Sequence, residues 1–336
     1  MLKVIDDEKL IRKYAKLFAR SFKPFTDETI RVKLGHQGAS FPAKVSWSKR
    51  LGVWSFSKSV ARIRYANSFG TGKPQEGSSL PITTEMNFPW SGIDRKTGAA
   101  FARDAWDNIY VIHRGKIGGG KKGIGKSLFE ENYRGVWSWM EDGDTPALVA
   151  VIGALQSPRF ALQAAQFVRK IDRLKSTVSS SLQTSLNFPD LSFREELIGD
   201  TPAVPAGGSL SEACDHDIIL SRLASLLKRW KFKVGNDADH ELFLMHPDDN
   251  RMSHVFAVSA DSTSRSILAA AADLLLRKSA GGEPLTAVLV IQEDKLIQYV
   301  QPLQRIGITA WACRLEAERI VFPDPGKIRL DQNPRL

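Results

Sequence analysis

The sequence predicts an α+β protein of two domains, in which a β-rich module flanked by helices precedes a smaller α/β domain. Three observations support this: short strand-like stretches between two helical patterns in residues 1–175, a Ser-, Pro- and Gly-rich segment over 176–214, and alternating helical and strand patterns in 215–336. A length of 336 residues suits two domains of ordinary size. We therefore expect a domain at 1–175, a linker at 176–214 and a domain at 215–336.

The first domain is expected to be rich in strands and to carry a helix at each end. The first helix covers residues 6–22, and the second runs from residue 157 to about residue 174. Strands are predicted at 30–34, 52–56, 61–65 and 80–86, with two hairpins that turn at 106–108 and around 141–144. This order forms a compact α+β module, and a small barrel is one arrangement that fits it.

The second domain is expected to alternate between helices and strands. Helices are predicted at 217–230, 264–278 and 295–305, and strands at 231–234, 241–246, 254–259, 286–291 and 309–313. The expected order is therefore αβββαβ, followed by a further helix and strand.

Positive charge is concentrated in the first domain. The whole chain has a formal net charge of +10. Residues 1–175 carry 30 Lys and Arg against 16 Asp and Glu, a net +14, whereas residues 176–336 carry 17 against 21, a net −4. This asymmetry favours a polyanionic partner, with nucleic acid, either DNA or RNA, as the foremost candidate. A basic surface without such a partner is the alternative.

The sequence favours a soluble cytoplasmic protein without a membrane partner. The first 18 residues contain acids where a secretion signal is apolar, and the longest apolar run, 147–155, is too short to span a bilayer. Cys214 and Cys313 lie far apart and imply no disulfide framework, which suits a reducing compartment.

The segment 120–127, GKKGIGKS, fits the pattern G-x-x-x-x-G-K-[ST] of the P-loop NTPases. A working P-loop needs a buried strand that leads directly into it, a helix that begins at Lys126 and Ser127, and an acid after a later strand. Here the preceding strand ends near Ile112, and Gly135 cuts the following helix short. Phosphate contact is therefore the expected role, and an NTPase that uses Lys126 is the alternative.

The stretch around this segment is rich in both glycine and cations. Glycine lets backbone N–H groups approach a phosphate closely, lysine supplies point charges, and arginine can grip a phosphate or a guanine edge. A solvated loop without a ligand is the alternative. The residues expected to contact nucleic acid here are His113, Arg114, Lys116, Lys121, Lys122 and Lys126.

Trp47 and Trp90 stand in segments with basic residues, KVSWSKR and FPWSGIDR. Most tryptophans pack in cores, but one beside a basic loop can stack on a base or line a pocket for a base. We therefore expect these two side chains to contribute to nucleic-acid contact. A β-module with flanking helices, basic loops and such aromatics loosely resembles the PUA-type and SRA-type readers of nucleic acid, by analogy and without a signature motif.

Residues 216–313 resemble the PD-(D/E)XK nuclease fold in the order of their expected elements. In that family, an acid on the second strand and an acid-x-Lys on the third hold magnesium and a water. The segment DADHELFLMH offers Asp239 or Glu241 as the first acid. On the third strand, Ala257 stands where the second acid belongs and Ser259 where the lysine belongs.

The resemblance therefore implies a degenerate nuclease fold that serves DNA contact, dimerisation or partner docking. Asp261 or Asp273 could supply a migrated acid. Magnesium is implied only if Asp239, Glu241 and Asp261 make an active centre, and no other metal is indicated. An unrelated small α/β domain with solvated acids is the alternative.

These observations predict a DNA-binding protein of restriction or genome-defence type that is non-catalytic or conditionally catalytic. Its C-terminal domain would resemble a nuclease and mediate a homodimer. The alternatives are an active, magnesium-dependent nuclease with a rearranged acidic site, and a P-loop NTPase. A third class of function is that of a scaffold that binds only proteins.

Overall fold

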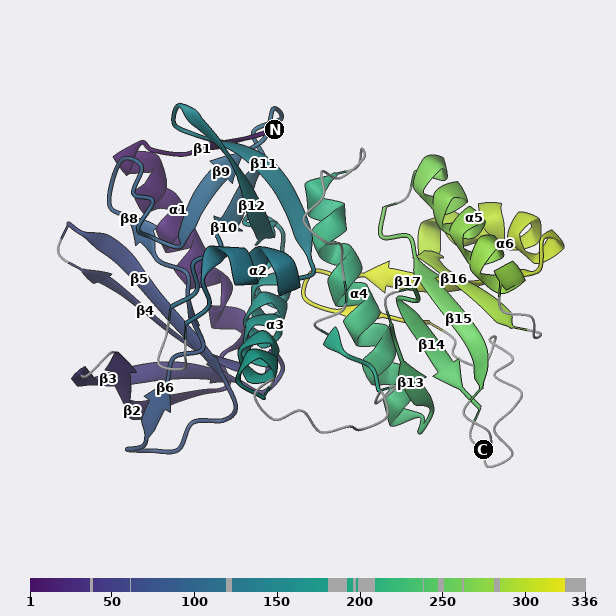
Figure 1. Cartoon of the computed structure of the whole chain (residues 1–336), viewed down its shortest axis with the longest axis horizontal. Helices are drawn as coiled ribbons and strands as arrows, with labels where there is room; N and C mark the ends of the chain where they lie inside the picture. The colour runs from purple at the N-terminus through teal and green to yellow at the C-terminus, as the bar shows by residue number, and fades with distance from the viewer. Residues whose placement is uncertain are drawn as a thin grey trace. The chain divides into compact units, whose positions relative to one another are not determined.

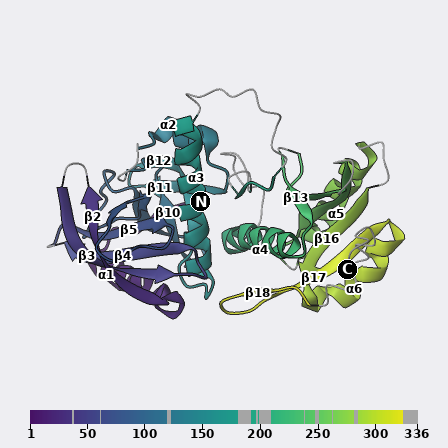
Figure 2. The same cartoon turned by 90° about the horizontal axis from the view of Figure 1, so that it is seen from below.

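The computed structural model describes residues 1–36, 39–60, 62–118, 123–180, 192–195, 198, 209–237, 239–246, 251–261, 263–280 and 285–323. The chain divides into two compact units, and each contains both strands and helices (Figures 1 and 2). The N-terminal unit comprises residues 1–185 and 199–214, and the C-terminal unit comprises residues 186–198 and 215–336. The protein therefore belongs to the expected mixed α+β class. Most of the expected linker lies outside the described residues.

Five strands of the N-terminal unit form a closed barrel. They are β1 (Leu2–Val4), β9 (Ala99–Arg103), β10 (Ile109–His113), β11 (Val136–Asp142) and β12 (Thr145–Ala154). The strands pair in the order β1-β11-β12-β10-β9, and the barrel closes because β1 also pairs with β9. The antiparallel hairpins β9–β10 and β11–β12 confirm the two predicted hairpins.

A second sheet lies in the same unit, with the order β6-β2-β3-β4-β5-β7 and with β8 paired to β5. Its strands are β2 (Glu28–His36), β3 (Ala39–Ser48), β4 (Val53–Val60), β5 (Arg64–Thr71), β6 (Ser79–Pro81), β7 (Thr84–Glu85) and β8 (Phe88–Pro89). Alternate residues of β2 and β3 are apolar and buried, as expected for strands with one face on a core. Trp54 on β4 completes that core.

Helix α1 (Glu8–Ser21) is central to the largest core of this unit. It begins where the Asp7 side chain accepts a 2.8 Å hydrogen bond from the Leu10 N–H, which satisfies one of the free donors of the first turn. Phe18 is fully buried, and its ring centroid lies within 6.1 Å of four other phenylalanine rings. These are Phe22, Phe69, Phe88 and Phe160.

Three further helical segments belong to this unit. They are the short 3₁₀ helix η1 (Lys23–Phe25), α2 (Lys126–Asn132) and α3 (Phe160–Ser180). Helix α3 packs against β12 of the barrel and against β5 of the second sheet, so it shares one core with α1. No helix in the described part of the chain is long and apolar enough to cross a membrane.

The C-terminal unit is built on a mixed six-stranded sheet of order β13-β14-β15-β16-β17-β18. Its strands are β13 (Lys233–Gly235), β14 (Leu242–Met245), β15 (Met252–Val258), β16 (Thr286–Gln292), β17 (Ile308–Leu315) and β18 (Ile320–Val321). Its helices are α4 (Leu210–Arg229), α5 (Ser264–Ala280) and α6 (Glu293–Arg305). The first residues of α4 belong to the N-terminal unit. β13, β14 and β15 are antiparallel neighbours, whereas β15, β16 and β17 run parallel. Helices α5 and α6 contribute to the core over β15 and β16.

Several elements differ from the sequence-based expectation. Strands β1 and β3 were not predicted, and β5 begins at Arg64 and extends to Thr71, beyond the predicted strand at 61–65. Helix α4 starts at Leu210, seven residues before the predicted start. The reason is tertiary packing, because Leu210 and Cys214 join an apolar cluster of the barrel that no local pattern reveals.

We predict that Phe18→Ala destabilises the protein by about 3–5 kcal/mol, since it removes the ring at the centre of five packed phenylalanines. Leu17→Ala is the control, because Leu17 stands next to Phe18 on α1 but is 36% exposed. Urea unfolding of both variants, followed by circular dichroism, measures the difference. Equal losses of stability in the two variants would contradict this view of the core.

Candidate nucleic-acid interface

The Gly- and Lys-rich segment 115–127 contains an isolated antiparallel bridge between Ile117 and Ile124, just before α2 begins at Lys126. Ile117 and Ile124 exchange two backbone hydrogen bonds of 3.0 and 2.9 Å, and both side chains are buried. Gly115 adopts a φ of +93°, and a Cβ there would lie 2.9 Å from the Phe129 ring, so only glycine fits. The predicted contact residues Lys121 and Lys122 lie outside the described residues.

This arrangement differs from what a P-loop NTPase requires. Strand β10, which precedes the segment, is antiparallel to both of its neighbours, β9 and β12. Helix α2 spans only seven residues, from Lys126 to Asn132. The surroundings of the motif are therefore not the parallel strand, loop and long helix on which phosphate binding by this motif depends.

Two of the predicted contact residues, His113 and Arg114, are interior residues. His113 is 1% exposed, and burial lowers its pKa to about 3, so the ring is neutral at ordinary pH. The Arg114 guanidinium donates two hydrogen bonds, of 2.9 and 2.7 Å, to the buried Asp142 carboxylate. Neither side chain therefore offers a free charge to a phosphate, and a run of cations in the sequence does not show which of them the fold buries.

Lys116 and Lys126 are the members of the predicted set that the structure places at the surface. The ammonium of Lys126 lies 3.5 Å from the Glu130 carboxylate, one turn further along α2. Exposed pairs of this kind contribute little to stability, so Lys126 can exchange its partner for a phosphate at low cost.

The two predicted tryptophans lie in different environments. Trp47 is 7% exposed and packs in the core of the second sheet with Trp54, so neither ring face is open to a base. Trp90 is half-buried and stacks on Tyr65 with a centroid distance of 5.1 Å and an interplanar angle of 8°. Its indole N–H donates a 3.1 Å hydrogen bond to Glu8. Trp90 is therefore held in a fixed orientation.

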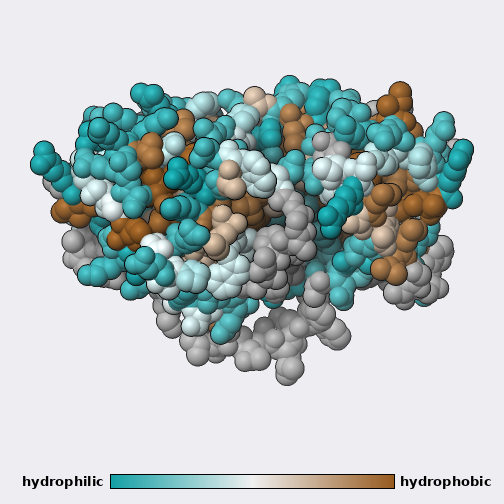
Figure 3. Space-filling model, turned by 90° about the horizontal axis from the view of Figure 1, so that it is seen from above, coloured by the Kyte–Doolittle hydropathy of each residue, from teal (hydrophilic) through white to brown (hydrophobic). Residues whose placement is uncertain are grey.

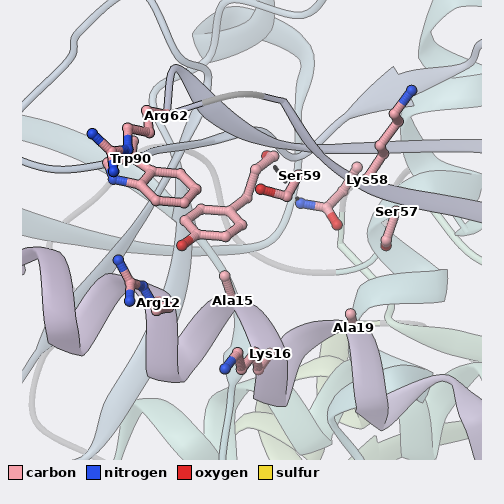
Figure 4. A pocket seen from close by; sticks show the side chains of 11 residues that line it. Arg12, Ala15, Lys16, Ala19, Ser57, Lys58, Ser59, Arg62 and Trp90 are labelled. Carbon is pink, nitrogen blue, oxygen red and sulfur yellow. Dashed lines mark hydrogen bonds between the residues drawn. The ribbon is translucent and has the colours of Figure 1, made fainter.

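Trp90 lines a cleft with a volume of about 650 Å³ between α1 and the β4–β5 hairpin (Figure 4). The cleft brings together segments that are far apart in the sequence. It is lined by Arg12, Ala15, Lys16, Ala19, Ser57, Lys58, Ser59, Arg62, Tyr65, Asn67 and Trp90. We call it the basic cleft.

One wall of the basic cleft is a face of α1. Arg12, Ala15, Lys16 and Ala19 follow one another at spacings of three, one and three residues, which places them along one side of a helix. Figure 4 shows these four residues along α1 on the side of the cleft. The two alanines leave the space open, because a longer side chain at Ala19 would project into it.

The opposite wall is the β4–β5 hairpin. Ser59 pairs with Tyr65 across the two strands, and the alternation of strand residues places both on the same face. Lys58 belongs to the other face, and in Figure 4 its side chain extends away from α1. Arg62 stands in the turn between the strands with a φ of +51°, in the left-handed region.

The basic cleft is strongly positive for its size. Four of its lining residues are cations, and none of the described residues that line it is an acid. The Arg12 guanidinium forms a 2.6 Å ion pair with Glu8 and lies 5.3 Å from the centroid of the Trp90 ring. Lys16 and Arg62 are not part of any ion pair within the described ranges. Two positive charges are therefore available to an anionic ligand.

Sequence analysis found Trp90 but missed the other residues of the basic cleft. Arg12, Arg62 and Tyr65 come from a helix, a turn and a strand, and no spacing in the sequence links them. The one local signal is the pair Arg12 and Lys16, which stand four residues apart on a helix rich in basic residues.

The acids of the C-terminal unit that the nuclease resemblance singled out are engaged in other contacts or exposed. Asp239 is exposed, and its backbone N–H donates to Asp237. The Asp261 carboxylate accepts hydrogen bonds from the N–H and hydroxyl of Thr263, just before α5. Glu241 lies 3.1 Å from His216.

Apolar packing surrounds the position that a second catalytic acid would occupy. Ala257 is 5% exposed in the middle of the sheet, opposite Leu289 of β16. Ser259 is also buried, and its hydroxyl donates to the Asp261 carbonyl. Within the described part of the chain, no three His, Cys, Asp or Glu side chains are grouped closely enough to hold a metal ion.

Comparison of the chain with protein-family models, with curated proteins and with solved structures finds no match. The function therefore has to be argued from the residues of the basic cleft and of the C-terminal sheet.

His216 on α4 is held between two carboxylates. Its Nε2 lies 3.1 Å from Glu241 and its Nδ1 lies 3.3 Å from Asp217. Burial lowers the pKa of His216, but the charge and hydrogen bonds of Glu241 and Asp217 outweigh it and hold the pKa well above its ordinary value. The histidine is thus protonated in the folded protein at neutral pH.

We predict that His216 makes the stability of the C-terminal unit depend on pH. Because its folded pKa is raised, its stabilisation is complete below about pH 6.5 and is lost as the pH rises through the folded value. His216→Gln should therefore lower the urea midpoint most at about pH 6, and the difference from the wild type should shrink as the pH rises through the folded pKa. Urea midpoints of both proteins across this range test it, and a constant difference would refute the charge-based account.

Proposed function

We propose that this protein binds nucleic acid through the basic cleft of its N-terminal unit, with DNA as the expected form. The observation that carries the proposal is that a stacked aromatic pair and two cations, Lys16 and Arg62, which have no ion-pair partner among the described residues, line the same cleft. Cations neutralise the phosphate backbone, and aromatic rings stack on bases whatever their sequence. Tight binding of a strand combines neutralisation of phosphates with stacking of bases, and the basic cleft has side chains suited to both.

The distribution of charge along the chain supports this proposal. Residues 1–175, which form most of the N-terminal unit, have a net charge of +14, whereas the remaining residues have a net charge of −4. A unit with such a surplus attracts a polyanion from a distance and holds it by releasing counterions. Lys116 and Lys126 at the surface add to this field.

We propose further that the C-terminal unit is a nuclease-like domain without a catalytic centre, in a protein of restriction or genome-defence type. The change from antiparallel to parallel pairing at β15 and the order of its elements support the resemblance to the PD-(D/E)XK fold. Ala257 at the acid position and the pairing of Glu241 with His216 support the loss of metal chemistry. Plasmid cleavage with Mg²⁺ or Mn²⁺ that disappears in Glu241→Gln would overturn this part.

Exposed apolar side chains support a homodimer through the C-terminal unit. Leu268 and Leu276 on α5 are 61% and 71% exposed, and Ile297 on α6 is 88% exposed. Figure 3 shows hydrophobic atoms gathered at the surface on the side of this unit. Apolar residues that form a contiguous patch on a protein surface mark an interaction site.

We predict a concentration-dependent dimer that Leu276→Asp abolishes, because the substitution places a charge in the apolar surface. Sedimentation velocity at increasing concentration measures the association. Lys295→Asp, on α6 but at a charged position, is the control and should leave association intact. A monomer at all concentrations for the wild type would refute the dimer without bearing on the basic cleft.

We predict that the affinity for DNA falls steeply with salt and that Lys16 and Arg62 contribute to the slope. Each phosphate contact that is lost should reduce the slope of log K against log salt by about 0.7–0.9. Lys16→Gln with Arg62→Gln should therefore reduce it by roughly 1.4–1.8. Fluorescence anisotropy of a labelled oligonucleotide, titrated from low salt to about 0.2 M, measures the slope.

The matched control is Lys33→Gln with Lys44→Gln, which removes the same charge. Both lysines are exposed on β2 and β3 and do not line the basic cleft. The control should change the slope much less than the cleft variant. A weak or salt-independent affinity of the wild type would refute the proposed function, and equal effects of the two variants would move binding away from the cleft.

A further inference from the structure

The size of the basic cleft restricts what it can hold. A volume of about 650 Å³ falls within the range of pockets that enclose small molecules, about 300–1,000 Å³. A double helix is too large to enter a cavity of this volume, whereas one nucleotide of a strand fits within it. The ligand proposed for the cleft is therefore a unit of a strand and not a length of duplex.

The walls of the cleft divide into an aromatic part and a cationic part. The aromatic part consists of Tyr65 and Trp90, whose rings lie 5.1 Å apart and nearly parallel. Glu8 accepts a hydrogen bond from the indole and pairs with Arg12, so both groups are held in place before any ligand arrives. A preformed wall of this kind binds a flat heterocycle without the cost of ordering side chains.

The cationic part comes from both walls of the cleft, with Lys16 on α1 and Arg62 in the β4–β5 turn. Neither is part of an ion pair within the described residues, so a phosphate would not have to displace a carboxylate. Arginine and lysine are the side chains that phosphate groups favour. A ligand with a flat ring and a phosphate meets complementary groups at both ends.

The ring of Tyr65, and not its hydroxyl, is the part that a ligand meets. The hydroxyl oxygen is buried and has no hydrogen-bond partner among the described residues. Removing it should therefore leave the cleft unchanged and cost no stability, since a buried hydroxyl without a partner is unfavourable. This distinguishes a stacking wall from a site that recognises its ligand through a hydroxyl group.

From these contacts we propose that the basic cleft holds one unpaired nucleotide, with its base against the Tyr65–Trp90 wall and its phosphate between Lys16 and Arg62. The inference rests on the proposed function and specifies its ligand. Because a base in a duplex must first be unpaired and unstacked, the protein binds single strands more tightly than duplexes of the same sequence. A nucleic-acid strand and a free nucleotide both present a nucleoside phosphate, and we expect the ligand of the cleft to be part of a strand.

The central experiment compares a single-stranded oligonucleotide, the same sequence as a duplex, and a strand of abasic units, each by fluorescence anisotropy with the wild type and with Ala19→Leu. Ala19→Leu fills the cleft without any change of charge. Ala66→Leu is the matched control, because Ala66 pairs with Lys58 on the face of the hairpin away from the cleft. Thermal melting of each variant checks that the unit remains folded.

The proposal expects Ala19→Leu to weaken single-strand binding about 5- to 150-fold, the loss that accompanies removal of one stacked base. Duplex binding and the salt slope should change little, and Ala66→Leu should resemble the wild type. Abasic strands should bind the wild type as weakly as normal strands bind Ala19→Leu. Tyr65→Phe should retain full affinity, whereas Trp90→Ala should lose it, which provides a second test if Ala19→Leu does not fold.

Other outcomes overturn the proposal in distinguishable ways. Equal, steeply salt-dependent binding of single strands and duplexes, unaffected by Ala19→Leu, would refute the nucleotide site and leave the proposed function standing. The absence of salt-dependent binding to any nucleic acid would refute both. Deoxyadenosine monophosphate that binds tightly and is not displaced by oligonucleotides would assign the cleft to a free nucleotide and would overturn the strand as its source.

Discussion

The packing of Phe18 against four other phenylalanine rings is the interaction on which the N-terminal unit depends. It joins α1 to the second sheet through Phe69 and to α3 through Phe160. The same helix carries Lys16 and Ala19 on its other side, toward the basic cleft. The geometry of the cleft is therefore set by a close-packed core, which deforms little, and not by the mobility of surface side chains.

Charge is used in two different ways in this protein. In the interior, the Asp142 carboxylate accepts two hydrogen bonds from Arg114 and also lies 3.4 Å from the Arg95 guanidinium, so the buried acid is neutralised by two cations. At the basic cleft, Lys16 and Arg62 are left without carboxylate partners among the described residues. In the C-terminal unit, His216 pairs with the partly exposed Glu241, which is one of the two acids that the nuclease resemblance offers as a metal ligand.

The features predicted correctly from the sequence are those that depend on neighbouring residues. The helix near residues 6–22, the two barrel hairpins and helix α5 follow from apolar spacing and turn residues, and the structure confirms them. The basic cleft is not local, because its walls meet only after α1 packs on the core. Composition likewise made His113 resemble a surface cation, although its ring packs against Phe129 of α2 and Phe167 of α3, contacts that sequence spacing does not encode.

Arg62 occupies a backbone conformation that is natural for glycine. A residue with a Cβ in the left-handed region costs roughly 1–2 kcal/mol, and a glycine in the turn would avoid that cost. The hairpin would thus close more easily without the side chain that it carries at its tip. The turn therefore carries, at a cost in folding free energy, a cationic side chain that lines the basic cleft.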